Sequence, residues 1–161
     1  MKKAVALALL SIALAACSSA PEPATTPPSA IPPPAIPAKV ADHTHLFPDD
    51  GKVSATVVGD HILDMKAMPG GSLAEYEVKG KKYRMFIIDA DSTQNAAFMM
   101  LDMKGEMKKD PEYIPYMGGY FGTYGDQPFY CFAKLHYLAG IEGLPKAQAD
   151  PLARELAAQL R

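Results

Sequence analysis

The sequence lacks the features that identify membrane-spanning and nucleic-acid-binding proteins most directly. Its N-terminal apolar run, residues 4–16, holds about 13 residues, whereas a membrane-spanning helix needs roughly 20. Basic groups do not predominate, because 16 Lys and Arg stand against 18 Asp and Glu. No basic stripe of the kind that nucleic acids require is present, nor a polybasic patch for anionic lipids. We therefore expect no nucleic-acid partner.

Cysteine is scarce, and the motifs of covalent hydrolases are missing. Cys17 and Cys131 are the two cysteines, and the sequence contains no GxSxG motif and no internal repeat. A nucleophile, a base and an orienting group cannot be singled out as a catalytic trio. We expect a protein that is not an enzyme and that carries no cofactor.

What the N-terminus does contain is a signal for export. Lys2 and Lys3 precede the apolar run, and small residues precede a cysteine, which is the order of a secretory signal peptide. The sequence Leu14-Ala15-Ala16-Cys17 resembles the bacterial lipobox. The resemblance implies that residues 1–16 are removed and that Cys17 becomes the first mature residue, bearing acyl chains such as palmitate.

Such an anchor places the protein in the bacterial cell envelope. A single acyl chain holds a protein only marginally, whereas the several chains of a bacterial lipoprotein anchor it permanently. The residue after the cysteine is Ser18 and not Asp, which favours the outer membrane, facing the periplasm, in a Gram-negative cell. Without Lys2 and Lys3 the mature chain has 14 basic and 18 acidic groups.

The mature chain divides into a linker and one globular domain. Residues 20–38 contain 8 of the 15 prolines, so residues 17–38 form the lipidated cysteine and an extended proline-rich spacer. At ~3.1 Å per residue this spacer reaches roughly 60 Å at most. Residues 39–161 are one domain by size.

The pattern of the domain predicts an α+β fold. Alternating and turn-bounded apolar runs predict strands, and the periodic runs after residues 91 and 150 predict helices. Asp150 would cap the second helix, with Pro151 at its first position. The expected order is β-β-β-β-α-β-β-α, a mainly antiparallel sheet of about six strands with two helices on one face. The expected strands are residues 53–58, 61–65, 73–78, 82–89, 119–124 and 128–138, and the first helix extends to about residue 108.

An aromatic cluster is the feature with the most functional character. Nine of the 14 aromatic residues fall between residues 113 and 137, with glycines interleaved. Such rings suit a groove that stacks on a sugar or grips a peptide. We therefore expect a binding or accessory module whose partner is an envelope protein, a peptide or a cell-wall glycan. The candidate partner-binding residues are Tyr113, Tyr116, Tyr120, Phe121, Tyr124 and Tyr130.

An acidic pair supports a first alternative, a small envelope hydrolase that uses Asp89 and Asp91. Asp89-Ala90-Asp91-Ser92-Thr93 resembles the DxDxT nucleophile motif of haloacid-dehalogenase-like phosphatases, and it follows an expected strand as in that family. A GDxxxD motif, Gly59 to Asp64, lies before the DxDxT motif, whereas the family has it after. The same residues also suit a helix cap and a turn.

Histidine and methionine side chains, which can ligate metals, support a second alternative, a metal-handling protein. His43 and His45 would share a face of an extended segment, and His61 lies near two aspartates, but the spacing is not that of a closed zinc site. Met99, Met103 and Met107 recur at helical spacing with Ala96 and Met100. They form either a soft-metal ladder joined by Cys131 or the apolar stripe of a helix. Alternation places Cys131 on an apolar strand face, where we expect a buried thiol.

Overall fold

The computed structural model describes residues 40–161. The expected signal peptide 1–16, the acylated Cys17 and the spacer 17–38 lie outside the described residues. Within the described part of the chain, no helix is both long and apolar enough to span a membrane. The elements are η1 (Thr44–Leu46), β1 (Lys52–Asp60), η2 (Ile62–Asp64), β2 (Pro69–Val78), β3 (Lys81–Asp89), α1 (Thr93–Glu106), β4 (Lys108–Ile114), β5 (Gly119–Tyr124), β6 (Gln127–Lys134), β7 (Tyr137–Glu142) and α2 (Lys146–Gln159).

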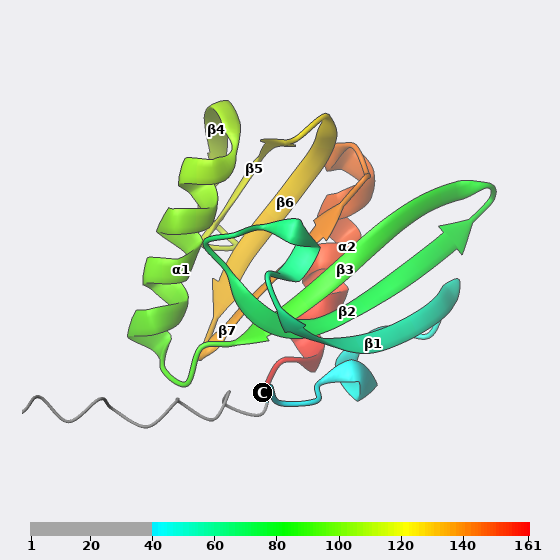
Figure 1. The fold of residues 1–161 in the computed structure, drawn as a ribbon. Helices are drawn as coiled ribbons and strands as arrows, with labels where there is room; N and C mark the ends of the chain where they lie inside the picture. Colours follow the sequence, from blue (N-terminus) through cyan, green and yellow to red (C-terminus); the bar gives the residue numbers. More distant parts are fainter. Residues whose placement is uncertain (1–39) are drawn as a thin grey trace, which may run out of the picture. The chain divides into compact units, whose positions relative to one another are not determined.

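The seven strands form one antiparallel sheet, which confirms the α+β class. The order across the sheet is β1-β2-β3-β7-β6-β5-β4, and every neighbouring pair is antiparallel. Strand β7 therefore lies beside β3 at the centre, and β1 and β4 are the two edges (Figure 1). The sheet has one strand more than the sequence predicted.

The two helices pack on opposite faces of the sheet, which corrects the expectation that they share one face. Strand β3 is buried on both sides, because Met85 and Ile87 point to one core and Phe86 and Ile88 to the other. We call the first side the α2 face and the second the α1 face, after the helix that covers each (Figure 1). A central strand that is apolar on both faces needs cover on both, and one helix supplies each.

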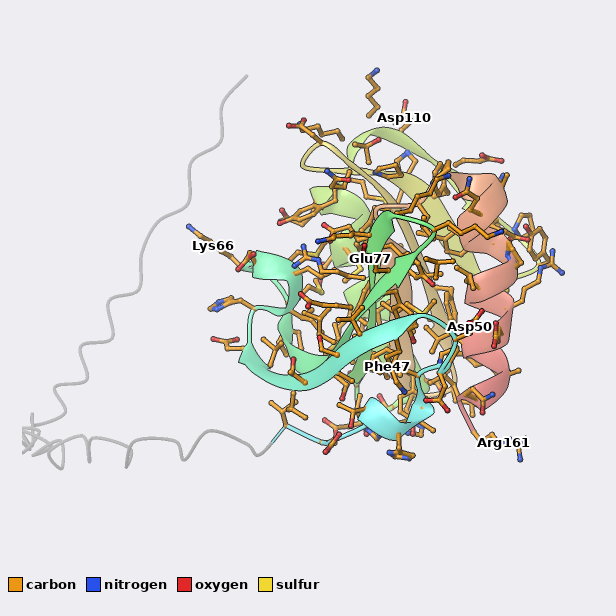
Figure 2. The ribbon with its side chains drawn as sticks, turned by 90° about the vertical axis from the view of Figure 1, so that its right-hand side faces the viewer. Phe47, Asp50, Lys66, Glu77, Asp110 and Arg161 are labelled. Carbon is orange, nitrogen blue, oxygen red and sulfur yellow. The ribbon has the colours of Figure 1, made fainter. Side chains whose placement is uncertain are left out.

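Each face has its own apolar core. Figure 2 shows Phe47, which is 3% exposed, among the interior side chains, while Lys66 projects outward. The α2 face buries Tyr76, Tyr83, Tyr130, Phe132, Ala153 and Leu156, and the α1 face buries Ile62, Met68, Met103, Phe129, Cys131 and Leu138.

Two strand predictions were wrong where the backbone turns without glycine, and one strand was missed. Residues 61–65 form the turn η2, with left-handed φ angles at His61, Leu63 and Asp64. The expected strand 128–138 is a hairpin of β6 and β7, which turns at Leu135 with φ 54°. Strand β4 was not predicted, and it tolerates Pro111 because it lies at the edge of the sheet.

The N-terminus of one helix agrees with the prediction, and that of the other differs. For α1 the cap is confirmed, since the Ser92 side chain accepts a hydrogen bond from the Asn95 amide. For α2 the helix begins at Lys146, one turn earlier than predicted, and Pro151 lies inside it. Asp150 does not cap the helix, because its carboxylate binds the hydroxyl groups of Tyr116 and Tyr130.

Candidate binding cleft

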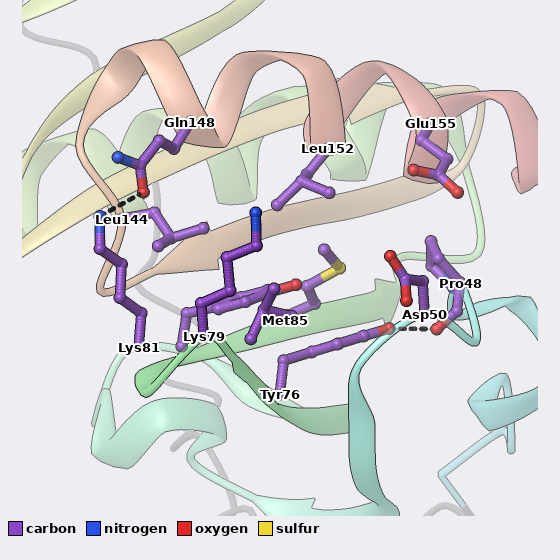
Figure 3. Close-up of a pocket in the computed structure, with 12 residues that line it drawn as sticks. Pro48, Asp50, Tyr76, Lys79, Lys81, Met85, Leu144, Gln148, Leu152 and Glu155 are labelled. Atoms are coloured by element: carbon purple, nitrogen blue, oxygen red, sulfur yellow. Dashed lines mark hydrogen bonds between the residues drawn. The ribbon is translucent and has the colours of Figure 1, made fainter.

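A cleft of about 400 Å³ opens between the β2–β3 hairpin and helix α2 (Figure 3). We call it the hairpin–helix cleft. The hairpin turns at Lys79 and Gly80, both with positive φ, which is the backbone that two-residue hairpin turns adopt. The lining residues are Pro48, Asp50, Tyr76, Val78, Lys79, Lys81, Tyr83, Met85, Leu144, Gln148, Leu152 and Glu155.

Two stacked tyrosines form the hairpin wall of the cleft. Tyr76 of β2 pairs with Tyr83 of β3, and the ring centroids lie 4.9 Å apart with planes at 5°. The Tyr76 hydroxyl donates to the Pro48 carbonyl at 2.7 Å, which fixes its ring. Burial raises the pKa of both phenols, so both remain neutral at physiological pH.

The two ends of the cleft carry opposite charge. Lys79 and Lys81 lie at the turn of the hairpin, and Lys81 donates to the Gln148 side chain at 3.1 Å. Asp50 and Glu155 lie at the other end (Figure 3). The apolar middle is closed by Met85 and, on the opposite side, by Leu144 and Leu152. A volume of this size and a mainly apolar lining with a few polar groups are typical of ligand sites.

A second cavity of about 520 Å³ lies beside the same hairpin, and half of its lining residues are charged. Arg84 of β3 pairs with Glu142 of β7 through two nitrogen–oxygen contacts of 2.6 Å. Glu75, Glu77 and Lys82 add three further charges to its lining. This cavity shares Tyr76 and Tyr83 with the hairpin–helix cleft, but Met85, Leu144 and Leu152 do not line it.

The six aromatic residues singled out in the sequence do not form one surface. Tyr113, Tyr120 and Tyr124 share one side of their strands by register, because Tyr113 pairs with Tyr120 and Tyr120 with Cys131. These three lie on the α1 face, where Tyr120 and Tyr124 pack against the core. The Lys104 amino group lies 5.1 Å from the Tyr120 ring centroid. Tyr113 is 53% exposed.

The other three aromatic residues belong to the α2 face. Tyr130 is fully buried, and Phe121 packs against the same core. Tyr116 and Tyr130 both donate to Asp150, and Arg154 stacks over the Tyr116 ring at 4.3 Å. This network ties the loop before β5 to helix α2, so these rings have a structural use.

The acidic pair also makes local contacts. Asp89 accepts a hydrogen bond from the Asp91 amide at 3.0 Å and contacts His43 at 3.1 Å. The Nε2 atom of His136 lies 3.9 Å from Oδ1 of Asp89. Asp91 itself is exposed and has a left-handed φ of 61°, as the residue before the Ser92 cap. The Asp89 carboxylate and the left-handed backbone of Asp91 therefore shape the turn that leads into α1.

The candidate metal ligands are dispersed. Between residues 40 and 161, no three His, Cys, Asp or Glu side chains are grouped as a metal site. His43 and His45 have ring centroids 6.4 Å apart, whereas His61 pairs with Asp60 at 3.0 Å.

The methionine stripe lies in the core under α1. Met103 and Met107 are buried, and Met99 is partly buried against them. Cys131 belongs to the same cluster and is 0% exposed. Burial raises the pKa of its thiol to about 12, and the weaker hydrogen bond to the Tyr120 backbone opposes this.

The sequence carried one signal for the cleft that the aromatic count overlooked. Tyr76 and Tyr83 are equidistant from the Lys79–Gly80 turn, so a two-residue hairpin must pair them. The contribution of Pro48 and Leu152 depends on how a distant loop and helix pack, which no local pattern indicates.

Comparison with known proteins yields a likeness of fold. No protein-family model matches the chain, and no curated protein matches it. The crystal structure of a GTP binding regulator from Thermotoga maritima is similar, with a TM-score of 0.51 and 9% sequence identity. The match covers 71% of this chain and 82% of that chain. At this identity the similarity shows a shared fold and nothing more.

Proposed function

We propose that the protein is a lipid-anchored binding module of the bacterial envelope, and that the hairpin–helix cleft takes a short peptide segment. The observation that carries the proposal is the charge arrangement of the cleft, with Lys79 and Lys81 at one end and Asp50 and Glu155 at the other. A peptide with an apolar middle and one charge of each sign at its ends complements this arrangement.

The walls of the cleft support the same ligand class. The stacked Tyr76 and Tyr83 rings form a stiff wall, which loses little conformational entropy when a ligand binds. The opposing Leu152 side chain is half-buried, so apolar surface remains for a ligand to cover. The sequence contains no GxxxxGK[ST] loop, the motif whose backbone amides hold nucleotide phosphates in P-loop proteins.

Charge reversal tests the proposal. The probe is the capped peptide Glu-Leu-Phe-Leu-Lys, with Lys-Leu-Phe-Leu-Lys as its matched control, and binding is measured by calorimetry. The wild-type protein should prefer the first peptide. The double variant Lys79→Glu, Lys81→Glu makes both ends acidic, so it should bind the first peptide at least tenfold more weakly and prefer the second. Unchanged preference in the variant would contradict the proposal.

The membrane anchor is tested separately. Cys17→Ala removes the acylation site, so the protein should leave the membrane fraction after cell breakage. Ser18→Ala is the matched control and should remain in that fraction. A Cys17→Ala protein that stays with the membranes would show that another segment anchors it.

A further inference from the structure

The two edges of the sheet differ in how they resist pairing with another strand. Edge β4 contains Lys108, Lys109, Asp110, Pro111 and Glu112 in succession, and its register with β5 shifts between residues 108 and 112. Charges, a proline and an irregular register are the devices by which proteins block an edge strand. The β4 edge is therefore protected.

The opposite edge, β1, has little of this protection. Its sequence is KVSATVVGD, nine residues without proline and with charge only at Lys52 and Asp60. Val53 is 66% exposed and Val57 is 41% exposed. Among residues 40–161, β1 pairs with β2 alone, so the backbone groups of its outer side have no strand partner there. A bulge near Val53 leaves residues 54–60 in regular register.

We propose that β1 is a dimerisation edge, at which a second copy of this chain adds its own β1 in antiparallel orientation. The charges carry the choice of partner. An antiparallel pair centred on Thr56 brings the basic end of each strand, Lys52 beyond the bulge, to the acidic end of the other, Asp60. In the same register Ala55 of each copy lies opposite Val57 of the other, which covers both exposed valines at position 57. The strand is thus complementary to itself.

The symmetry of the arrangement agrees with this choice. A two-fold axis at Thr56 uses the same residues on both copies, as the commonest class of oligomer does. The spacer of the same chain is unsuited to the edge, because its prolines lack the amide donors that a ladder needs. The β1 edge is a different surface from the hairpin–helix cleft, and pairing there does not depend on a ligand in the cleft.

Disulfide trapping of the full chain in cells tests both the edge and its register. Opposed residues of an antiparallel pair have Cα atoms about 4.5–5.5 Å apart, which a disulfide spans. After oxidation with copper–phenanthroline, Thr56→Cys should give a covalent dimer. Ser54→Cys and Val58→Cys should each give little covalent dimer when expressed alone. When the two variants are expressed together they should give a mixed covalent dimer, because these positions oppose one another. Glu112→Cys on β4 is the matched control, and wild type gives the baseline.

Each outcome decides the question. A Thr56→Cys dimer together with the mixed Ser54–Val58 product supports the proposal. No dimer from any β1 variant, or equal dimer from Glu112→Cys, would overturn it. A covalent adduct between Thr56→Cys and a different protein would also overturn it, because the edge would then receive a foreign strand.

Discussion

The rings of Tyr76 and Tyr83 stack across the β2–β3 hairpin with their centroids 4.9 Å apart, and the Tyr76 hydroxyl donates a hydrogen bond to the Pro48 carbonyl. The pair therefore links three parts of the chain: the two arms of the hairpin and the loop before β1. This link holds the wall of the hairpin–helix cleft in place.

The first prediction separates the two hydroxyl groups. Tyr76→Phe keeps the stack and removes the bond to Pro48, so the free energy of unfolding should fall by about 1 kcal/mol. Among the described residues the Tyr83 hydroxyl has no hydrogen-bond partner, and Tyr83→Phe should change stability by less than about 0.5 kcal/mol. Urea unfolding measures both, and equal effects would show that the Pro48 bond contributes nothing.

The second prediction concerns the ion pair of Arg84 and Glu142, whose side chains are 36% and 8% exposed. Arg84→Met leaves a nearly buried carboxylate unpaired and should cost on the order of 1–3 kcal/mol. The double variant with Glu142→Leu should recover part of that loss. The exposed pair of Lys82 and Glu77, at 3.8 Å, is the control, and Lys82→Met should cost less than about 0.5 kcal/mol. Additive losses in the double variant would refute the coupling.

The sequence predicted most of the sheet because its signals there are local. The apolar alternation of the strands predicted at 73–78 and 82–89 marks the central hairpin, whose turn the structure places at Lys79–Gly80, and Ser92 marks the start of α1. It failed at Leu135 and His61, which adopt left-handed backbone without being glycine, asparagine or aspartate. In these places the packing of both flanking strands outweighs local preference.

The candidate site was less predictable than the fold. Residues of one strand alternate between the faces of the sheet. Tyr120 and Phe121 are neighbours in sequence, but their side chains therefore lie on opposite faces of β5. Tyr76 and Tyr83, seven positions apart, meet instead. The use of Asp150 as an acceptor for two distant tyrosines also has no local signature.

The third prediction follows from Asp150. Burial raises the pKa of its carboxyl, but hydrogen bonds from Tyr116, Arg154 and Tyr130 outweigh this and hold it below the ordinary 3.8. A folded-state pKa below the unfolded one stabilises the fold above the unfolded value, and the contribution is lost as the pH falls through the folded value. Wild-type stability should therefore decline below about pH 4.

Replacing that carboxylate isolates its share of the decline. Asp150→Asn should destabilise the protein by about 1.5 kcal/mol at pH 7 and by less at pH 3, because below the ordinary value of 3.8 the carboxyl of the unfolded chain is mostly protonated and the advantage of the folded state shrinks. Asp102→Asn, at an exposed position of α1, is the control and should leave both values near wild type. Urea unfolding at the two pH values gives the comparison, and an Asp150→Asn loss that is as large at pH 3 as at pH 7 would contradict the assignment.

The fourth prediction concerns the thiol of Cys131, which is fully buried and whose pKa burial raises to about 12. The thiolate is the reactive form, so the folded protein should resist iodoacetamide at pH 8 and react at this position only after unfolding in denaturant. Leu135→Cys places a thiol at a half-exposed turn of the same hairpin and should be alkylated in the folded state. Peptide mass mapping distinguishes the two positions. Rapid labelling of Cys131 in the folded wild type would mean that the core between α1 and the sheet opens readily, because no other route exposes a thiol packed against Phe129 and Met103.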